Sequence, residues 1–229
     1  HCVPKSSVDL YRHLVESAGA KITAIDAAPV CATRLLSLDK NCPNLYCLID
    51  LGGSTTPISM VSERQLYYST LVPFGSNHLT SEISKAFGIS FEAAEKLKRL
   101  HGRNERETAY KTPIITIPGE EPKQYYQADL NRVIENWFID FNVKVSAAME
   151  KLAEDTINRS YGDGVEAWNK CPAVLVGGGS NLYGIEKLIK PAVGEKPPVC
   201  YRPIVAGCRD PRFANLLGML TYRCTSKLQ

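Results

Sequence analysis

The sequence predicts an α/β fold in which one mixed sheet carries helices on both faces and a small subdomain is inserted between two elements. Two observations lead to this prediction. Apolar stretches of strand length alternate with amphipathic stretches at helical spacing through residues 45–222. The elements follow the order βββα, an insertion, then αβαβα, which is typical of such a sheet. A chain of 229 residues with 44% hydrophobic side chains can also bury the core that this sheet needs.

Two helices and a short strand are expected before the sheet begins. Apolar residues recur at helical spacing over 8–18, and Gly19 ends this first helix. A short strand is expected over 21–25. Pro29 then opens a second helix, because proline is well tolerated at the first helical position. Residues 41–44 are expected to form a linker.

Three strands and two helices come next, followed by the insertion. The strand patterns cover 46–51, 57–61 and 66–72. Helical spacing covers 77–87 and 91–101, and the second of these helices is expected to be capped by Ser90 and closed by Gly102. Within the insertion, strands are expected over 113–117 and near 125–126.

The longest predicted helix begins near Asp129 and keeps an apolar face to about residue 155, with Trp137 and Phe138 as core residues. The remaining elements are a strand over 173–176, a helix over 182–189, a strand over 199–201 and a last helix over 210–222. Without the insertion, this order is close to that of a ribonuclease-H-like lobe. The turns after the first and fourth strands should therefore open at the same crevice.

Those two turns are the candidate binding elements. Glycine has no Cβ, so a glycine-rich turn can present backbone N–H groups to phosphate oxygens. Asp50, at the end of the first strand, can hold a metal-bound water, although each turn alone is equally consistent with an ordinary hairpin or helix entry. Together they point to an actin-type nucleotide cleft. The candidate phosphate-binding residues are Gly52, Gly53, Ser54, Thr55, Thr56, Gly177, Gly178, Gly179 and Ser180.

Charge and cysteine content argue against several other functions. The net charge is +3 without a dense basic block, so nucleic-acid binding is not expected. The eight cysteines form no C-x-x-C pair, and we expect reduced thiols without a bound metal. No apolar run reaches the ~18 residues of a membrane span and no signal peptide opens the chain, so a cytoplasmic protein is expected.

Five motifs in order resemble the bacterial cell-division protein FtsA, a family of the actin-like ATPase superfamily. Residues 48–56 resemble the second phosphate-binding hairpin of that family, and residues 72–80 resemble its vpvGGxhiT segment. Residues 91–98 are similar to its eeAExlK helix, and residues 174–185 resemble its adenosine motif. Residues 210–219 resemble its closing helix. The resemblance covers nearly the whole chain.

The resemblance implies a site for ATP and Mg²⁺. Glu95 and Lys98 lie three residues apart on one helix face and are expected to bond ribose and adenine; an exposed ion pair is the other interpretation of this spacing. Asp50 is the metal candidate. The family's aspartate after the threonine pair is Pro57 here, and a glycine of its turn is Ser54. We therefore expect at most a weak ATPase, inactive as this chain alone, and assign no catalytic residue.

The resemblance also divides the chain and implies its partners. Residues 1–40 are expected to be the end of a first actin-like lobe, and residues 41–229 a second lobe with an inserted subdomain at about 88–128. The implied partner is an FtsZ-type tubulin homologue that docks on this subdomain, and the full-length form is expected to self-associate and scaffold the division ring at the septum. Residues 223–229 show no counterpart of the family's amphipathic targeting helix, so membrane contact is expected to be indirect.

Three other functions fit part of the pattern. A PilM-like pilus-assembly protein shares the helix motif at 91–98 and the glycine motifs, whereas residues 74–80 and 210–214 favour FtsA. A kinase of the actin and sugar-kinase superfamily would need a catalytic carboxylate and a substrate pocket in the first lobe. A metal-dependent nuclease would need a carboxylate where Gly177–Gly179 stand.

Overall fold

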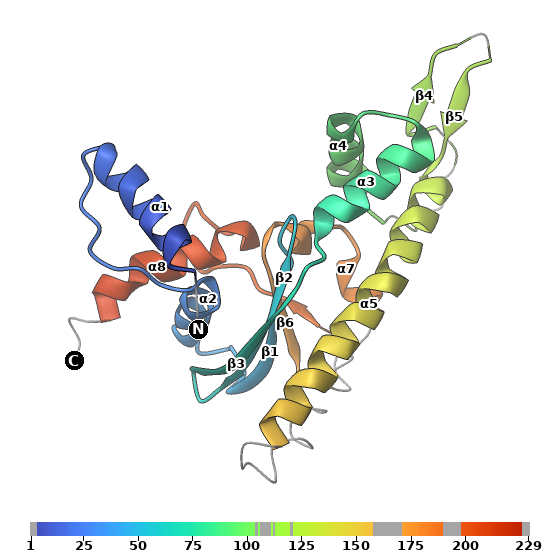
Figure 1. Cartoon of the computed structure of the whole chain (residues 1–229). Coiled ribbons are helices and arrows are strands. Elements are labelled where there is room, and N and C mark those ends of the chain that lie inside the picture. The colour runs from blue at the N-terminus through green and yellow to red at the C-terminus, as the bar shows by residue number, and fades with distance from the viewer. Residues whose placement is uncertain are drawn as a thin grey trace.

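The structure, a computed structural model, describes residues 4–103, 105, 111, 113–119, 121–157, 171–189 and 198–225. At its centre is a five-stranded sheet with the strand order β3-β2-β1-β6-β7 (Figure 1). The strands are β1 (Leu45–Asp50), β2 (Thr56–Ser62), β3 (Gln65–Val72), β6 (Ala173–Val176) and β7 (Val199–Cys200). β1 pairs antiparallel with β2 and parallel with β6, so the sheet is mixed. The prediction that these five strands form one sheet is confirmed.

Helices cover one face of the sheet, where the larger core lies. They are α3 (Ser76–Phe87), α4 (Phe91–His101), α5 (Gln127–Ile157) and the short α7 (Ile185–Leu188). α5 runs along this face, with α3 and α4 beside its first half (Figure 1). Its apolar stripe packs against α3, β3 and β2, because side chains at helical spacing share one face. Members of this core include Ile49, Ile58, Leu79, Ile83, Leu130, Ile134, Phe138 and Phe141.

The opposite face is covered by two helices from the two ends of the chain, α2 (Ala28–Ser37) and α8 (Ala214–Thr225). They pack closely because Gly218 leaves room for the backbone of α2: a Cβ at this position would lie 1.8 Å from the carbonyl oxygen of Cys31. Arg34 Nη1 donates a hydrogen bond of 3.0 Å to the Gly218 carbonyl. The second core lies beneath them and includes Leu36, Tyr46, Leu48, Val174, Val176 and Ala214.

A separate two-stranded sheet lies at the end of α3 and α5 that is remote from the central sheet (Figure 1). β4 (Ile115–Ile117) and β5 (Lys123–Tyr125) pair antiparallel, as predicted for the insertion. The Tyr125 ring stacks on Phe87 with ring centres 4.3 Å apart, so this pair of strands is held to the end of α3. By contrast, none of the residues of α1 (Lys5–Ser17) is buried.

Two predicted elements differ from the structure. Residues 21–25 are not a strand: they lead from α1 to α2 and pair with no described strand, so their backbone gains no ladder hydrogen bonds. The helix predicted over 182–189 is reduced to α7, because Gly184 has φ 77° and interrupts the helical backbone. The 3₁₀ turns η2 (Gly178–Asn181) and η3 (Pro211–Phe213) precede α7 and α8.

No helix among the described residues is both long enough and apolar enough to cross a bilayer. The prediction about residues 223–229 falls partly outside the described residues, which end at 225.

Candidate functional site

The two glycine-rich turns are joined directly, because they follow neighbouring parallel strands. Leu51, at the end of β1, lies between them. Its N–H donates to the Val176 carbonyl at 2.9 Å, and its own carbonyl accepts from the Gly179 N–H at 2.8 Å. A Cβ on Gly179 would lie 2.4 Å from the Leu51 side chain, so the second turn can close over the first only with glycine there.

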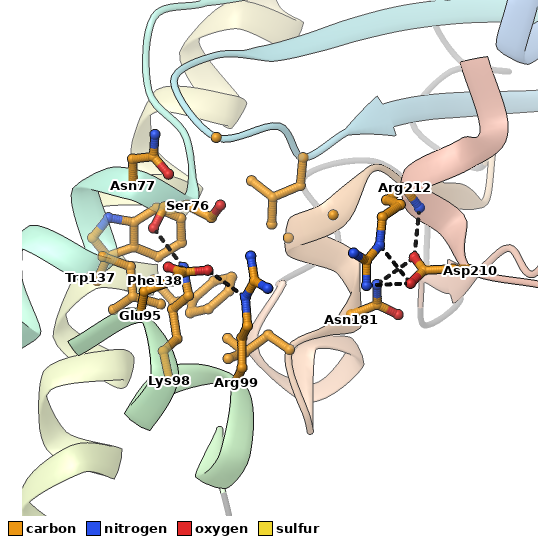
Figure 2. Close-up of a pocket in the computed structure, with 16 residues that line it drawn as sticks. Ser76, Asn77, Glu95, Lys98, Arg99, Trp137, Phe138, Asn181, Asp210 and Arg212 are labelled. Atoms are coloured by element: carbon orange, nitrogen blue, oxygen red, sulfur yellow. Dashed lines mark hydrogen bonds and ion pairs between the residues drawn. The ribbon is translucent and has the colours of Figure 1, made fainter. Parts of the chain in front are cut away.

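A cavity of about 400 Å³ opens beside these turns. The glycine turns form one wall, α4 and α5 form a second, and the segment before α8 forms a third (Figure 2). Its size and its mixture of apolar and charged groups are those of a small-molecule site. The lining residues are Leu51, Gly53, Ser76, Asn77, Leu79, Glu95, Lys98, Arg99, Trp137, Phe138, Gly178, Gly179, Asn181, Leu182, Asp210 and Arg212.

Each turn also has backbone N–H groups that have no partner among the described residues. Those of Gly53, Ser54, Thr55 and Gly178 donate to no other group among the described residues. Gly177 makes the second turn possible: it adopts φ 85°, and a Cβ there would lie 2.3 Å from Asp50 Oδ1. Gly53 and Gly178 line the cavity, whereas Ser54 and Thr55 lie further along the first turn, outside its lining. Unpaired N–H groups in such turns form a concave site for anions.

The start of α3 holds the first turn in place. The N–H groups of Ser76 and Asn77 donate to the carbonyls of Gly52 and Gly53 at 2.9 and 2.8 Å. These helix N–H groups are therefore used within the protein and are not available to a ligand. A Cβ on Gly75 would lie 2.4 Å from the Gly53 carbonyl oxygen, so the contact depends on glycine.

Glu95 and Lys98 lie together in the α4 wall, as predicted, but their polar atoms are already paired. Lys98 is buried, and its Nζ contacts Glu95 Oε2 at 2.6 Å, Thr80 Oγ1 at 2.7 Å and the Ser76 carbonyl at 3.2 Å. Glu95 Oε1 accepts from Arg99 Nε at 2.7 Å. Burial alone would raise the pKa of Glu95, but the hydrogen bonds from Lys98, Thr80 and Arg99 outweigh it and lower this pKa to about 2.

The Glu95 pairing predicts a defined acid sensitivity. Because the folded pKa of about 2 lies below the ordinary value of 4.5, ionised Glu95 stabilises the fold fully above pH 4.5. That contribution is lost as the pH falls from 4.5 towards 2. We expect the stability difference between wild type and Glu95→Gln, measured by urea unfolding, to shrink steadily over this window. A difference that is constant with pH would contradict the assignment.

Asp50, Thr56 and Ser180 are all buried, and each has a partner within the protein. Asp50 Oδ2 accepts from Asn215 Nδ2 at 2.7 Å. Burial raises the pKa of the Asp50 carboxyl, and the Asn215 bond opposes this effect. The Thr56 hydroxyl donates to the Phe74 carbonyl, and the Ser180 hydroxyl donates to the Gly177 carbonyl, both at 2.7 Å. These two hydroxyl groups stabilise the turns, and they do not line the cavity.

Asp50 does not belong to a cluster of metal-binding side chains within the described ranges. In the described part of the chain, no group of three or more histidine, cysteine, aspartate or glutamate side chains could hold a metal. Asp50 Oδ1 accepts no hydrogen bond from a described residue, which leaves one carboxylate oxygen for a water or an ion.

The sequence did not reveal the third wall. Asp210 caps η3 by accepting from the Arg212 N–H at 2.9 Å, and its other oxygen accepts from Arg212 Nε at 2.7 Å. Asn181 Nδ2 also donates to Asp210 at 2.7 Å. Burial alone would raise the pKa of Asp210, but these bonds lower it to about 2. The Asp-Pro cap was predictable, but its position against η2 was not.

Comparison with known proteins identifies the family. The model of the family described as cell division protein FtsA matches residues 47–218, well over half of the chain. This chain belongs to the FtsA family. It is 29% identical to the FtsA of Enterococcus hirae over 224 residues, which cover 96% of this chain and 47% of that protein. It is 28% identical to the Bacillus subtilis FtsA over 92% of this chain and 46% of that protein. The chain thus spans about half the length of these relatives.

Solved structures show that this FtsA-family chain has an actin-like fold. MreB5 of Spiroplasma citri bound to ADP superposes with a TM-score of 0.70 and 17% identity, over 99% of this chain and 68% of that one. The PilM–PilN type IV pilus biogenesis complex gives a TM-score of 0.66 and 18% identity, over 93% of this chain and 56% of that one. At these identities the likeness concerns the fold.

Proposed function

We propose that this chain binds ATP or ADP in the cavity, with the phosphates on the two glycine turns. The observation that carries the proposal is the set of unpaired N–H groups at Gly53 and Gly178, one from each turn, on the lining of the same cavity. Backbone N–H groups of this kind hold phosphates in many nucleotide sites. The charged side chains of the lining are three cations (Lys98, Arg99, Arg212) and two carboxylates (Glu95, Asp210), so the cavity carries a net positive charge that favours an anionic ligand.

The nucleoside would lie against the α4 wall, where the apolar surface is. Glu95 and Lys98 would contribute mainly by holding this wall in place, because their polar atoms are paired within it. Mg²⁺ is expected to be held by phosphate oxygens and water, since this ion keeps several waters and takes few protein ligands. Asp50 Oδ1, behind Gly177, is the group that would orient one of those waters. The ion would neutralise phosphate charge when bound.

At the level of the cell, we propose an FtsA-like role in division that includes contact with an FtsZ-type tubulin homologue and self-association of the longer protein. Family membership supports this role. The proposed docking region is the inserted subdomain at about 88–128, of which α4, β4 and β5 are described. We also propose that residues 1–40 end a first lobe and that 41–229 form the second, at the cytoplasmic face of the division site.

Substitution of Gly178 tests the nucleotide site. The atom nearest to a Cβ on Gly178 is 3.8 Å away, so Gly178→Asp fits the fold while placing a carboxylate beside the phosphates. For the wild type we expect a dissociation constant of ~0.1–1 mM for Mg-ATP in calorimetric titration. We expect the variant to bind at least about tenfold more weakly, because the carboxylate repels the phosphate charge.

Gly119→Asp is the matched control for charge and size. Gly119 lies in the β4–β5 connection, away from the cavity, and its nearest neighbour to a Cβ is 3.7 Å away. This control should bind Mg-ATP like the wild type. Equal binding by the Gly178→Asp variant and its control would refute the proposed site.

A further inference from the structure

Two arginines face each other across the cavity. Arg99 comes from α4 and Arg212 from η3, and Figure 2 shows their guanidinium groups on opposite sides of the opening. Each is anchored by one carboxylate: Arg99 Nε donates to Glu95 at 2.7 Å, and Arg212 Nη2 lies 2.6 Å from Asp210. The Arg212 guanidinium also packs over the Phe213 ring, at 5.6 Å from the ring centre. In both arginines a carboxylate therefore holds part of the guanidinium group in place, while much of the side chain stays exposed.

Other side chains near these arginines offer little to read the edge of a base. The polar atoms of Glu95 and Lys98 bond to each other and to α3. The Asn181 amide donates to Asp210, and its oxygen lies 3.4 Å from Arg202 Nη1. The rest of this part of the lining is apolar, with Leu79, Phe138 and Leu182. A base between the arginines would meet flat cations and apolar surface. The other polar side chains of the lining, Ser76 and Asn77, lie at the start of α3 beside the first glycine turn, where the phosphates are proposed to bind.

We propose that Arg99 and Arg212 clamp a purine base between their guanidinium planes. The proposal rests on the proposed nucleotide site and adds how the base is selected. Guanidinium groups are planar and weakly hydrated, and they stack on π systems. Two like charges across a gap repel each other, and a π-electron face placed between them attracts both. A bicyclic purine covers more of both planes than a pyrimidine does.

Such a clamp would distinguish bases by the size of the ring and not by the hydrogen-bonding groups along the edge of the base. ATP and GTP should therefore bind with similar affinity, within about threefold, because stacking tolerates any base with a π face. CTP and UTP should bind about tenfold more weakly than ATP, since the smaller ring loses part of the stacking. The phosphate contacts at the glycine turns should be the same for all four.

The test is titration of the whole chain, with Mg²⁺ present, using ATP, GTP, CTP, UTP and inorganic tripolyphosphate. The variants are Arg99→Lys and Arg212→Lys, which keep the positive charge but remove the planar guanidinium group. Arg132→Lys is the matched control. Arg132 lies on the exposed surface of α5 and pairs with Asp129, away from the cavity. We expect each lysine variant at the clamp to lose most of the purine preference, while its affinity for tripolyphosphate and its melting temperature stay as in the wild type.

The outcomes separate the clamp from the nucleotide site. If the wild type binds tripolyphosphate and nucleotides but the lysine variants keep the full preference for purines, the clamp is refuted and the site stands. If the affinity of both variants for tripolyphosphate falls as much as their affinity for ATP, the arginines bind phosphate, which also refutes the clamp. If the wild type binds none of the five probes, the nucleotide site itself is refuted and the clamp with it.

Discussion

A Gly218→Ala chain is expected to be less stable than the wild type by roughly 3 kcal/mol, a large loss for one methyl group. In an exposed helix the same change would stabilise by up to ~1 kcal/mol, because alanine has the higher helix propensity. The sign reverses here because the added Cβ would lie 1.8 Å from the Cys31 carbonyl oxygen of α2. Backbone atoms cannot rotate away as a side chain can, so the two helices must separate.

Urea unfolding of the two chains measures this loss. Leu216→Ala is the control, since Leu216 lies on the same helix with 51% of its surface exposed. The control should change the unfolding free energy by less than about 0.5 kcal/mol. A Gly218→Ala chain as stable as the wild type would show that α2 and α8 do not pack as described.

Lys98→Met is expected to lower the free energy of unfolding by about 2–4 kcal/mol, because removing one member of a buried ion pair leaves the other charge without its partner. Methionine matches the length of the lysine stem but removes the positive charge beside Glu95 Oε2, which then keeps only the Thr80 hydroxyl as a donor at that oxygen. Arg99 still pairs with Glu95, which keeps the estimate below the largest losses of this kind.

Lys96→Met is the matched control, because Lys96 lies two residues away on the exposed side of α4. It should leave the unfolding free energy nearly unchanged. The Lys98→Met, Glu95→Gln double variant should recover part of the loss, since the unpaired charge is then absent. Equal stability of the Lys98 and Lys96 variants would contradict the described network.

Local signals in the sequence were sufficient for most of the fold. α4 was predicted with its bounds, because Ser90 accepts from the Ala93 N–H as an N-cap and Gly102 follows the last turn. The strands β1 and β6 were found because each is an apolar run bounded by glycine. The strand expected over 21–25 was wrong because apolar character does not provide a neighbour to pair with.

The glycine turns of the candidate site were predictable from the sequence. The third wall of the cavity, which carries Asp210 and Arg212, was not. A glycine-rich sequence indicates a turn, because the backbone geometry of a turn is set by a few neighbouring residues. The position of Arg212 depends on the contact between η2 and η3, where Asn181 bonds to Asp210 across a separation of 29 positions in the sequence. Trp137 and Phe138 show a related limit of periodicity. It predicted their burial, and both are buried, but it did not indicate that both also line a cavity.

The contact between α2 and α8 also has a kinetic consequence. The hydrogen bond from Arg34 to the Gly218 carbonyl joins residues 184 positions apart, so this face of the sheet closes only after both α2 and α8 have been synthesised. Contacts of such long sequence separation form slowly. During synthesis, Tyr46, Leu48 and Val174 would wait uncovered on a partly built sheet, a state prone to aggregation. That exposure ends only when α8 has left the ribosome and packs against α2.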